Sequence, residues 1–508
     1  MTQFKNGLLA GVAAFSLLGF ASAAKADPTP ECNAGPAAQS TECGANAAAT
    51  GIGATVTGNG AGGLAEQTTV NGNSAAALGI GGIAVGGNTD GGAYGALATD
   101  AAGIAVGSDA EARQIGAVSI GSDGNADGDG AVSNGVYSVA LGADAMSMGT
   151  NATAVGGRAT AGAAQTTVVG GQAAALGVGG VAIGGNSDGG AYGALVTDAA
   201  GVALGADTEA RGVGAIAIGG DADGDGDGAV ANGRDTIAIG DGALAQNTTG
   251  AGATDDNVAI GSQARATGVH VTAIGGDSSA TGIGATAIGW EADATANNAT
   301  ALGNSAEATA AQATAIGRQT NATGIDSTAL GQGSSATMLN ATALGQGAQA
   351  VHMNSVALGA DTSTTAANQV NVGGRTIGNV GNGVAAGDAV NLSQLTATNA
   401  MIASESANRA VADAALTSRL DDMSFDIRDT AREGRAGTAA ALAAAGLPQA
   451  SGEGRTMIAG GFGTYRGKAA FAAGASHRLQ GGNATFKLGV TYDSEKNVGA
   501  NGGVGFEF

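Results

Sequence analysis

The chain has 508 residues, of which 95 are Gly, and only 3% of its residues are aromatic. Ala dominates the apolar residues and buries little area per side chain, so we expect a repetitive, elongated architecture rather than one compact core. The net charge of −22, with no Lys between Asp27 and Ala436, would repel phosphate backbones and argues against a nucleic-acid partner.

Two other classes of elongated or unfolded chain are disfavoured by the same composition. Collagen is excluded because Gly does not recur at every third residue and only 4 Pro are present. Plain disorder fits poorly, because the charged fraction is only 12% and the mean hydropathy is +0.13.

Residues 1–26 are predicted to form a secretory signal peptide. Lys5 supplies the basic start, and residues 7–21 form an apolar stretch that is too short to span a bilayer. Ala24-Lys25-Ala26 offers a cleavage site, with a cut after Ala23 as the alternative. No later apolar run is long enough for a transmembrane helix, so the mature chain is expected to lack one.

Residues 27–78 are interpreted as an N-terminal segment that holds both cysteines of the chain, Cys32 and Cys43. A disulfide closing this small loop would suit an oxidising compartment outside the cytoplasm. Free or inter-chain thiols are the alternative.

Residues 79–373 contain a lattice of glycines. Each follows a short apolar unit of the type VAIG at 258–261, and successive glycines are separated by 14 residues or by 21. A second duplication overlies the first, because residues 67–145 match residues 165–243 at an offset of 98. All these steps are multiples of seven, so the insertions preserve a physical register. The lattice consists of Gly86, Gly107, Gly121, Gly142, Gly156, Gly170, Gly184, Gly205, Gly219, Gly240, Gly261, Gly275, Gly289, Gly303, Gly317, Gly331, Gly345 and Gly359.

Small and apolar residues alternate with period two in each unit, which predicts short strands. Two strands and two Gly-containing corners make one 14-residue coil of a parallel β-roll, in which Gly supplies positive φ and Ala fits a narrow interior. One such roll buries little surface, so we expect several chains to associate side by side.

Residues 374–395, which include DAVNLSQL, are predicted to form a neck, and residues 396–436 a coiled-coil stalk. Four polar residues interrupt the a/d seam, and such residues lower stability but fix register and strand number. The apolar members of the heptad frame are Leu392, Leu395, Ile402, Leu416, Leu420, Met423 and Ile427; the polar ones are Asn399, Ser406, Arg409 and Asp413.

Residues 437–508 are interpreted as a translocator and membrane anchor. A helix of small residues over 437–447 precedes four strand-like segments, 456–465, 469–479, 484–492 and 498–508. Each segment has the length of a membrane β-strand, and the aromatic residues concentrate here as interfacial girdles require. Four strands cannot close a barrel, but three chains supply twelve. We expect the helix to lie in the pore, where three copies share one lumen; its lumen residues are Gly437, Ala440, Ala441 and Ala444.

The order of signal, AIG-type roll, DAVNLSQL neck, coiled coil and four-strand end resembles the trimeric autotransporter adhesins (YadA-like, type Vc secretion). The resemblance covers the chain from about residue 75 onward. It implies a mainly β homotrimer with a β-roll head, a coiled-coil stalk and a twelve-stranded outer-membrane barrel that exports the head to the cell surface. It also implies that Phe508 is read by the outer-membrane assembly machinery, and that the ligand is extracellular matrix, a host cell, an abiotic surface or another copy of the protein.

No catalytic constellation is present, because the three His are isolated and the many G-x-G-x-x-G matches lack a βαβ context. No enzymatic activity and no cofactor are therefore expected. Two loops satisfy the first half of a calcium-binding loop, but the Glu expected at its end is absent, so a plain polar loop is the main interpretation and weak calcium binding the alternative. The candidate calcium ligands are Asp123, Asn125 and Asp127 in one loop, and Asp221, Asp223 and Asp225 in the other.

Tyr94, Tyr192 and Trp290 are candidate ligand contacts. The tyrosines lie in the duplicated GGAYGAL segments, and Trp290 directly follows a lattice glycine. An exposed Trp is a common interface anchor, whereas packing over the neighbouring coil is the simpler interpretation. An adhesin is favoured over a structural coat or spacer protein, since loops inserted in a rigid rod present binding surface.

Overall fold

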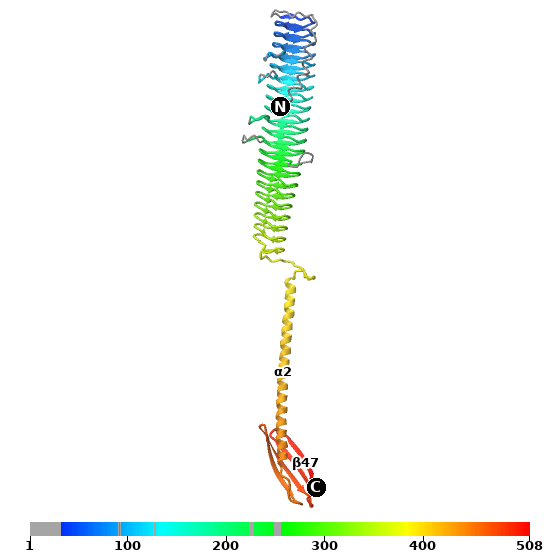
Figure 1. Cartoon of the computed structure of the whole chain (residues 1–508), viewed down its shortest axis with the longest axis vertical. Helices are drawn as coiled ribbons and strands as arrows, with labels where there is room; N and C mark the ends of the chain where they lie inside the picture. Colours follow the sequence, from blue (N-terminus) through cyan, green and yellow to red (C-terminus); the bar gives the residue numbers. More distant parts are fainter. Residues whose placement is uncertain are drawn as a thin grey trace. The chain divides into compact units, whose positions relative to one another are not determined.

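The computed structural model describes residues 32–89, 91, 93–125, 129–187, 189–222, 228–247 and 256–508. The predicted signal peptide lies outside these residues. The chain forms two compact units, which divide between Arg375 and Thr376 (Figure 1). Within the described part of the chain, no helix has the length and apolar character needed to cross a membrane.

The first unit is a parallel β-roll with coils of 14 residues. Each coil contains a three-residue strand, a turn, usually a two-residue strand and a second turn. Each strand pairs in parallel with the equivalent strand of the next coil; Val258 pairs with Thr272, for example, 14 residues further on. The predicted β-roll is therefore confirmed, and its coils form two parallel sheets.

The longer strands form the sheet that we call sheet A, which ends in β43 (Val370–Asn371) and otherwise consists of β2 (Thr41–Cys43), β4 (Thr55–Thr57), β6 (Thr69–Asn71), β8 (Ile83–Val85), β10 (Ile104–Val106), β12 (Val118–Ile120), β14 (Val139–Leu141), β16 (Thr153–Val155), β18 (Thr167–Val169), β20 (Val181–Ile183), β22 (Val202–Leu204), β24 (Ile216–Ile218), β26 (Ile237–Ile239), β28 (Val258–Ile260), β30 (Thr272–Ile274), β32 (Thr286–Ile288), β34 (Thr300–Leu302), β36 (Thr314–Ile316), β38 (Thr328–Leu330), β40 (Thr342–Leu344) and β42 (Val356–Leu358).

The shorter strands form sheet B, which consists of β3 (Ala48–Ala49), β5 (Gly62–Gly63), β7 (Ala76–Ala77), β9 (Leu97–Ala98), β11 (Glu111–Ala112), β13 (Val132–Ser133), β15 (Met146–Ser147), β17 (Thr160–Ala161), β19 (Ala174–Ala175), β21 (Leu195–Val196), β23 (Glu209–Ala210), β25 (Val230–Asn232), β27 (Leu244–Gln246), β29 (Arg265–Thr267), β31 (Ser279–Ala280), β33 (Asp293–Ala294), β35 (Glu307–Ala308), β37 (Asn321–Ala322), β39 (Ser335–Ala336) and β41 (Gln349–Ala350).

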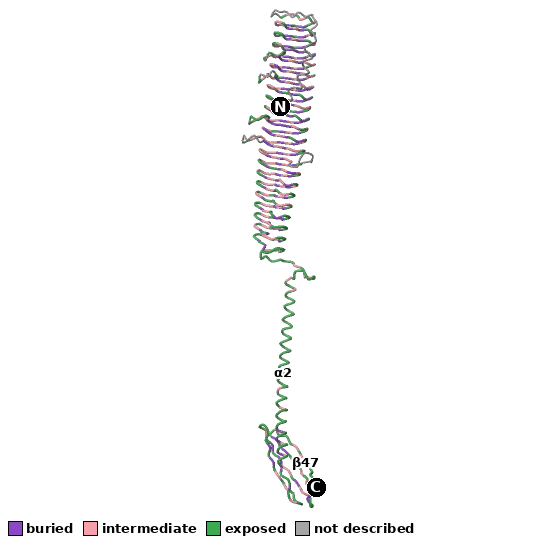
Figure 2. The backbone as a smooth tube through the Cα atoms, in the orientation of Figure 1, coloured by how far each residue is buried: buried purple, intermediate pink, exposed green. Residues whose placement is uncertain are grey.

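The interior of the roll is built almost entirely from Ala. The middle residue of each three-residue sheet A strand is buried while its two neighbours are more exposed. Buried residues recur in every coil along the roll (Figure 2), and their apolar side chains form three clusters, the longest of which runs from Ala152 to Ala357. Ala105 and Ala259, for example, have no exposed surface. The narrow interior that the sequence indicates limits these middle positions to Ala, Ser and Val in every coil but the first, which holds Glu42.

The lattice glycines are required for two reasons. Gly317 has φ +130°, which L side chains rarely adopt. A Cβ atom added there would also lie only 2.9 Å from the carbonyl carbon of Gly331 in the next coil. Coils about 4.8 Å apart leave no room for a methyl group at this corner. The lattice extends upstream through Gly44, Gly58 and Gly72, which have the same conformation.

The segment 27–78 is not separate from the roll, contrary to the sequence interpretation. Sheet A already begins at Thr41, and β2 pairs in parallel with β4 in the regular 14-residue register. Thr and Asn replace Val and Ile in these first strands, so the apolar signal that marks the later coils is weak here.

A short antiparallel strand covers the first coil of the roll. β1 (Cys32–Ala34) pairs with β2 so that Cys32 lies opposite Cys43, and the two form a disulfide. Inside the same coil, Glu42 occupies the position that Ala takes elsewhere, and its carboxylate accepts a hydrogen bond of 3.1 Å from the Ala49 N–H.

The second unit contains the neck, a long helix and a four-stranded sheet. The helix α2 (Leu392–Ala445) begins in a capping box, in which Asn391 accepts from the Gln394 N–H and the Gln394 side chain accepts from the Asn391 N–H. Before it, Asp388 accepts hydrogen bonds from the N–H groups of Val384 and Ala385. These bonds lower the pKa of Asp388 below its ordinary value.

The predicted stalk and pore helix are one continuous helix, so the boundary drawn at residue 437 is not a structural break. Gly437 is tolerated inside α2 because Ala-rich flanks favour the helix. The helix ends at the Gly446 cap, two residues before Pro448. The heptad residues that the sequence assigns to a seam are exposed in the single chain: Leu392, Leu395, Ile402, Leu416, Leu420, Met423 and Ile427.

The C-terminal strands form one antiparallel sheet in the order β44 (Thr456–Tyr465), β45 (Lys468–Arg478), β46 (Ala484–Asp493) and β47 (Val498–Phe506). These bounds lie within two residues of the predicted ones, and Phe508 follows the last strand with its side chain exposed.

The end of α2 packs on one face of this sheet. Ala436, Ala439 and Ala443 are buried there, whereas Gly437 and Ala441 are exposed and Ala440 and Ala444 are half-buried. The strands contribute glycines to the contact; a Cβ on Gly463 would lie 2.3 Å from the Ala439 carbonyl oxygen. Small residues on both partners therefore let helix and sheet approach closely.

Candidate binding face of the head

Seven-residue insertions give the roll its loops. Four of them follow lattice glycines at the same corner, after β8, β12, β20 and β24, and each lengthens the connection to the next sheet B strand by seven residues. A fifth insertion lies at the other corner, between β27 and β28. The coils remain in register on both sides of each insertion, as the steps of 21 in the sequence predict.

The two GGAYGAL loops, which follow β8 and β20, have the same internal support. In the first, the Asn88 side chain accepts from the Gly91 N–H at 2.6 Å and donates to the Tyr94 carbonyl at 3.1 Å. In the second, Asn186 bonds in the same way to the Gly189 N–H and to the Tyr192 carbonyl. Each Asn therefore closes its loop across the base.

A buried Asp in the next coil holds each of these loops. The Asp109 carboxylate accepts from both the N–H and the hydroxyl of Thr89, and Asp207 accepts from both groups of Ser187. Asp109 is only 3% exposed and Asp207 only 6%. The sequence analysis did not single out these residues, although their repetition at the offset of 98 marks them.

The Asp-rich loops follow β12 and β24. Of the candidate calcium ligands, Asp127, Asp223 and Asp225 lie outside the described residues. Asp123 accepts a hydrogen bond from the Asn125 N–H, and Asp221 accepts one from the Ser187 hydroxyl at 3.3 Å. Within the described ranges, no three His, Cys, Asp or Glu side chains form a group that could hold a metal ion.

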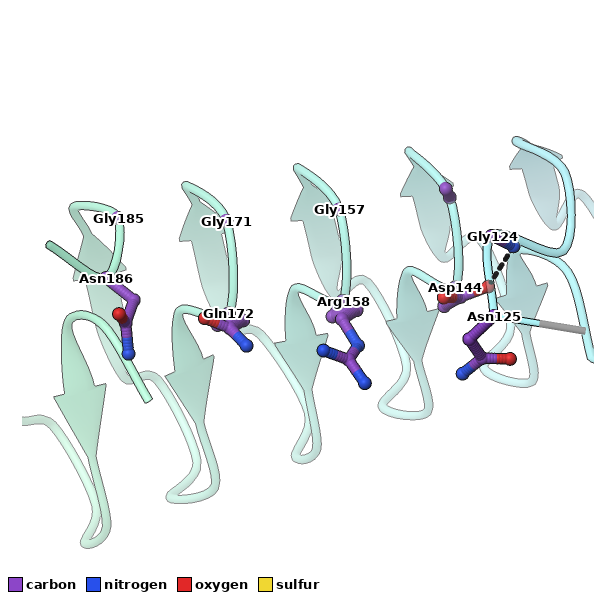
Figure 3. Close-up of a pocket in the computed structure, with 10 residues that line it drawn as sticks. Gly124, Asn125, Asp144, Gly157, Arg158, Gly171, Gln172, Gly185 and Asn186 are labelled. Carbon is purple, nitrogen blue, oxygen red and sulfur yellow. Dashed lines mark hydrogen bonds between the residues drawn. The ribbon is translucent and has the colours of Figure 1, made fainter. Parts of the chain in front are cut away.

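A groove of about 620 Å³ runs along the loop-bearing corner between two loops (Figure 3). Gly124 and Asn125 of the loop after β12 form one end, and Asn186 of the loop after β20 forms the other. The four coils that span it are about 4.8 Å apart, so the groove is about 14 Å long between Asp144 and Asn186. Its lining combines glycines and one Ala with polar side chains and consists of Gly124, Asn125, Ala143, Asp144, Gly157, Arg158, Gly171, Gln172, Gly185 and Asn186.

The aromatic candidates differ in exposure. Tyr94 is 49% exposed, and Tyr192 is half-buried. Trp290 is 51% exposed, and its ring lies over Gly276 of the preceding coil, where an added Cβ would be 3.3 Å from the ring. Trp290 thus packs over the neighbouring coil and remains half exposed, and its role as a ligand contact stays a prediction. Tyr137, which the sequence analysis did not single out, is 61% exposed and lies over Gly116.

A polar column follows the outer face of sheet B at the first position of its strands from β29 to β41. Asp293 lies between Ser279 and Glu307 of the adjacent coils. Partial burial raises the pKa of Asp293 above its ordinary value, and the nearby Glu307 raises it further, while a hydrogen bond from Ser279 opposes this rise.

Comparison with known families matches both units of the chain. Residues 448–508 match the YadA-like membrane anchor domain. The YadA head domain repeat matches at 128–145, 149–173, 200–222, 226–243, 258–278, 280–306, 308–334 and 336–362.

Two characterised relatives are similar over parts of their length. One is the autotransporter adhesin NhhA of Neisseria meningitidis serogroup B, at 36% identity over 129 residues, which are 25% of this chain and 18% of the relative. The other is the autotransporter adhesin BtaF of Brucella suis biovar 1, at 35% identity over 92 residues, which are 18% of this chain and 33% of the relative. The matches thus span a third or less of these relatives.

Among solved structures, the collagen-binding domain of the Yersinia adhesin YadA is similar at 29% identity with a TM-score of 0.28, over 36% of this chain and 96% of that domain. The family models place a head repeat and a membrane anchor in one chain, in the order that the β-roll and the four-stranded sheet follow here. The chain belongs to the YadA-like trimeric autotransporter adhesins.

Proposed function

We propose that the chain is a bacterial surface adhesin that anchors itself in the outer membrane as a homotrimer and exposes its head for attachment. The observation that carries this proposal is the open C-terminal sheet. In the described chain, β44 and β47 each have a single neighbouring strand. An open sheet edge cannot lie in lipid, so three copies closing a twelve-stranded barrel satisfy all edges.

The two faces of this sheet support a barrel wall. One face carries α2, while the other exposes apolar side chains such as Phe462, Leu488 and Val504. Phe462, Phe471 and Tyr492 lie in one row across three strands. An exposed apolar face with aligned aromatic residues suits contact with lipid and its interface.

Trimer formation is also supported by surfaces that a single chain leaves uncovered. Sheet A exposes aliphatic side chains along the roll at the last strand position, such as Leu302, Leu330 and Leu358. The a/d residues of α2 are exposed as well. Contiguous apolar surfaces of this extent mark interfaces, and parallel helices with heptad seams associate as coiled coils.

Attachment is assigned to the loop-bearing corner of the head. Its loops are tied by specific hydrogen bonds, and a groove lies between two of them. A coat or spacer protein would need neither feature, because the regular coils alone provide length. The class of attachment target is extracellular matrix, a host cell, an abiotic surface or another copy of the protein.

The proposal is tested by expressing the chain in a non-adherent Gram-negative host. We expect a heat-sensitive trimer in the outer-membrane fraction and increased attachment to immobilised matrix, to cultured cells or between bacteria. A matched variant that lacks residues 448–508 should lose both. A detergent-extracted chain of monomeric mass would contradict the trimer, and a trimer on the surface that increases no attachment would favour the spacer protein.

A further inference from the structure

We infer that the groove between the loops after β12 and β20 binds an uncharged, hydroxyl-rich linear saccharide chain that lies along the roll axis. The inference rests on the proposed adhesin function and names the chemistry of one ligand. It starts from the groove itself, which has a volume of about 620 Å³ and is lined by glycines and polar side chains apart from Ala143.

The floor of the groove is bare although the fold does not require glycine there. Gly157 and Gly171 directly follow lattice glycines, yet neither has a positive φ. A Cβ added to Gly157 would lie 3.8 Å from its nearest neighbour, and one added to Gly171 would lie 3.9 Å away, which is ordinary contact. Outside the groove the same position carries Gly, Ala or Ser in some coils, such as Gly276 and Ser262, and large side chains in others: Trp290, Asn304, Arg318, Gln332 and Gln346.

The bare floor leaves polar groups open to a ligand. Gly157 and Gly171 are exposed, and within the described chain their N–H groups donate no hydrogen bond. The Arg158 guanidinium forms no ion pair with any described residue, and its side chain projects from the groove wall beside Gln172 (Figure 3). Donors therefore recur coil by coil along the floor.

Acceptors lie in the same groove. The Asp144 carboxylate accepts from the Gly124 N–H at 2.8 Å, which fixes its orientation beside the floor and leaves its other oxygen for a ligand hydroxyl. Saccharide hydroxyls both donate and accept, so they match a surface that combines amides, a guanidinium and a carboxylate. The described residues at both ends of the groove are held by hydrogen bonds: the Gly124 N–H donates to Asp144, and the Asn186 side chain accepts from the Gly189 N–H at 2.6 Å. Residues that are already held in place lose little freedom on binding.

Charge and spacing disfavour the other linear ligands. The head is strongly acidic, and Arg158 beside Asp144 leaves the groove with little net charge. A polyanion would therefore find no net electrostatic attraction there. An extended peptide advances about 3.3 Å per residue, out of step with coils about 4.8 Å apart, and the groove offers no free strand edge for it to pair with. A pyranose ring is close to the coil spacing in length.

The test uses the full-length trimer and a set of linear hexasaccharides, with cellohexaose, maltohexaose and mannohexaose as uncharged probes. A hyaluronate hexamer and an extended Ser/Thr peptide serve as the charged and peptidic alternatives. We expect at least one uncharged probe to bind with little dependence on salt. Gly171→Gln, which places on the floor a residue that other coils carry there, should weaken binding at least about tenfold, equivalent to about 1.4 kcal/mol.

Arg158→Gln should also weaken binding, and Gln is compatible with the backbone because Gln165 and Gln172 adopt the same positive φ. Ser262→Gln, at the equivalent position outside the groove, is the control and should bind as the unmodified chain does. Binding of the hyaluronate or the peptide alone would overturn the inference, as would saccharide binding that survives both groove variants. If a surface trimer mediates attachment but binds no saccharide, the saccharide inference is wrong and the proposed adhesin function is still supported. If no trimer forms, the proposed function itself is wrong.

Discussion

Lys487 donates hydrogen bonds to the carbonyl oxygens of Ala444, at 2.9 Å, and Leu447, at 3.3 Å, and so caps the C-terminal end of α2 from strand β46. The last carbonyls of a helix have no partner within the helix and carry partial negative charge, which a cation offsets. One residue of the sheet thus satisfies carbonyl groups at the end of the helix and ties the two elements together.

Replacing this lysine should loosen the anchor. Lys487→Met keeps the length of the side chain but removes the charged donor, and hydrogen bonds to charged groups contribute about 1.5–3 kcal/mol. We expect the detergent-extracted trimer to dissociate at a lower temperature, measured as the loss of the trimer band on heating. Lys496→Met, in an exposed turn, is the control. Equal dissociation temperatures for both variants would mean that the cap does not stabilise the anchor.

The lattice glycines and the groove glycines should respond differently to the same substitution. Gly317→Ala introduces a Cβ 2.9 Å from the backbone of the next coil at φ +130°, so we expect a loss of several kcal/mol or failure of the roll to form. Gly157→Ala meets no such contact and should change the free energy of unfolding by less than about 1 kcal/mol in either direction, since Ala also lowers the entropy of the unfolded chain. Thermal unfolding of the full chain, followed by circular dichroism, compares the two. Similar losses would contradict the assignment of separate roles.

Asn257 is a fully buried polar residue whose bonds are all made inside the roll. Its amide donates to the carbonyls of Gln246 and Gly268, and its oxygen accepts from the Val271 N–H. Asn257→Ala leaves these three groups unpaired and opens a cavity, so we expect a cost of about 2–4 kcal/mol. Asn297→Ala, at an exposed corner, should cost far less. Denaturant unfolding measures both, and a neutral Asn257→Ala would show that water replaces the amide.

The raised pKa of Asp293 predicts a pH-dependent stability. Because folding raises this pKa, the folded state binds more protons than the unfolded state between the two pKa values, and stability falls as pH rises through that window. At neutral pH the charged carboxylate therefore destabilises the roll. Asp293→Asn should melt at a higher temperature than the unmodified chain near pH 7, and the difference should vanish below about pH 4.

The control for that prediction is Asp326→Asn at an exposed corner. It should show no comparable gain at neutral pH. If Asp293→Asn melts at the same temperature as the unmodified chain at both pH values, burial at this position is too slight to influence folding.

The proposed place of α2 in the pore makes a prediction about export. Ala441 is exposed in the single chain, on a different face from Ala439 and Ala443, which contact the sheet. Three helices in one lumen would turn this exposed face toward one another, so Ala441→Trp should crowd the lumen and reduce head display. Protease accessibility of the head on intact cells, relative to total anchor, measures this. Normal display would place the helix outside the pore.

A control for general misfolding is available on the same helix. Ala410→Trp lies in the exposed middle of α2 and outside the heptad seam. It should leave head display close to that of the unmodified chain.

Periodicity made most of the fold predictable. The spacing of the lattice glycines fixed both the coil and the places where it carries insertions, since backbone crowding at Gly317 permits no other residue. The start of the roll was missed because Thr55 and Thr57 occupy positions where later coils carry Val or Ile. The strand register continues in these first coils although their outward-facing residues are no longer apolar, because small interior residues and backbone pairing maintain it.

The candidate site was less accessible to sequence reasoning. Tyr94 and Tyr192 were identified because they are conspicuous within a duplicated segment, whereas Asp109 and Asp207 look like ordinary surface carboxylates. Their burial arises only when the loop of the preceding coil folds over them, a contact across 20 residues. The groove could not be predicted from the sequence either. It forms where stacked coils place glycines instead of larger side chains next to one another.

The disulfide-bonded strand β1 has a consequence for crowded cells. A parallel roll that ended in a bare strand would be a template on which the tip of a neighbouring rod could continue the ladder, as in a growing fibril. With Cys32 bonded opposite Cys43, the chain reverses direction there, and the antiparallel β1 occupies the outer edge of β2. The first parallel strand is therefore not open for pairing with the roll of a neighbouring chain, which disfavours end-to-end association of the heads.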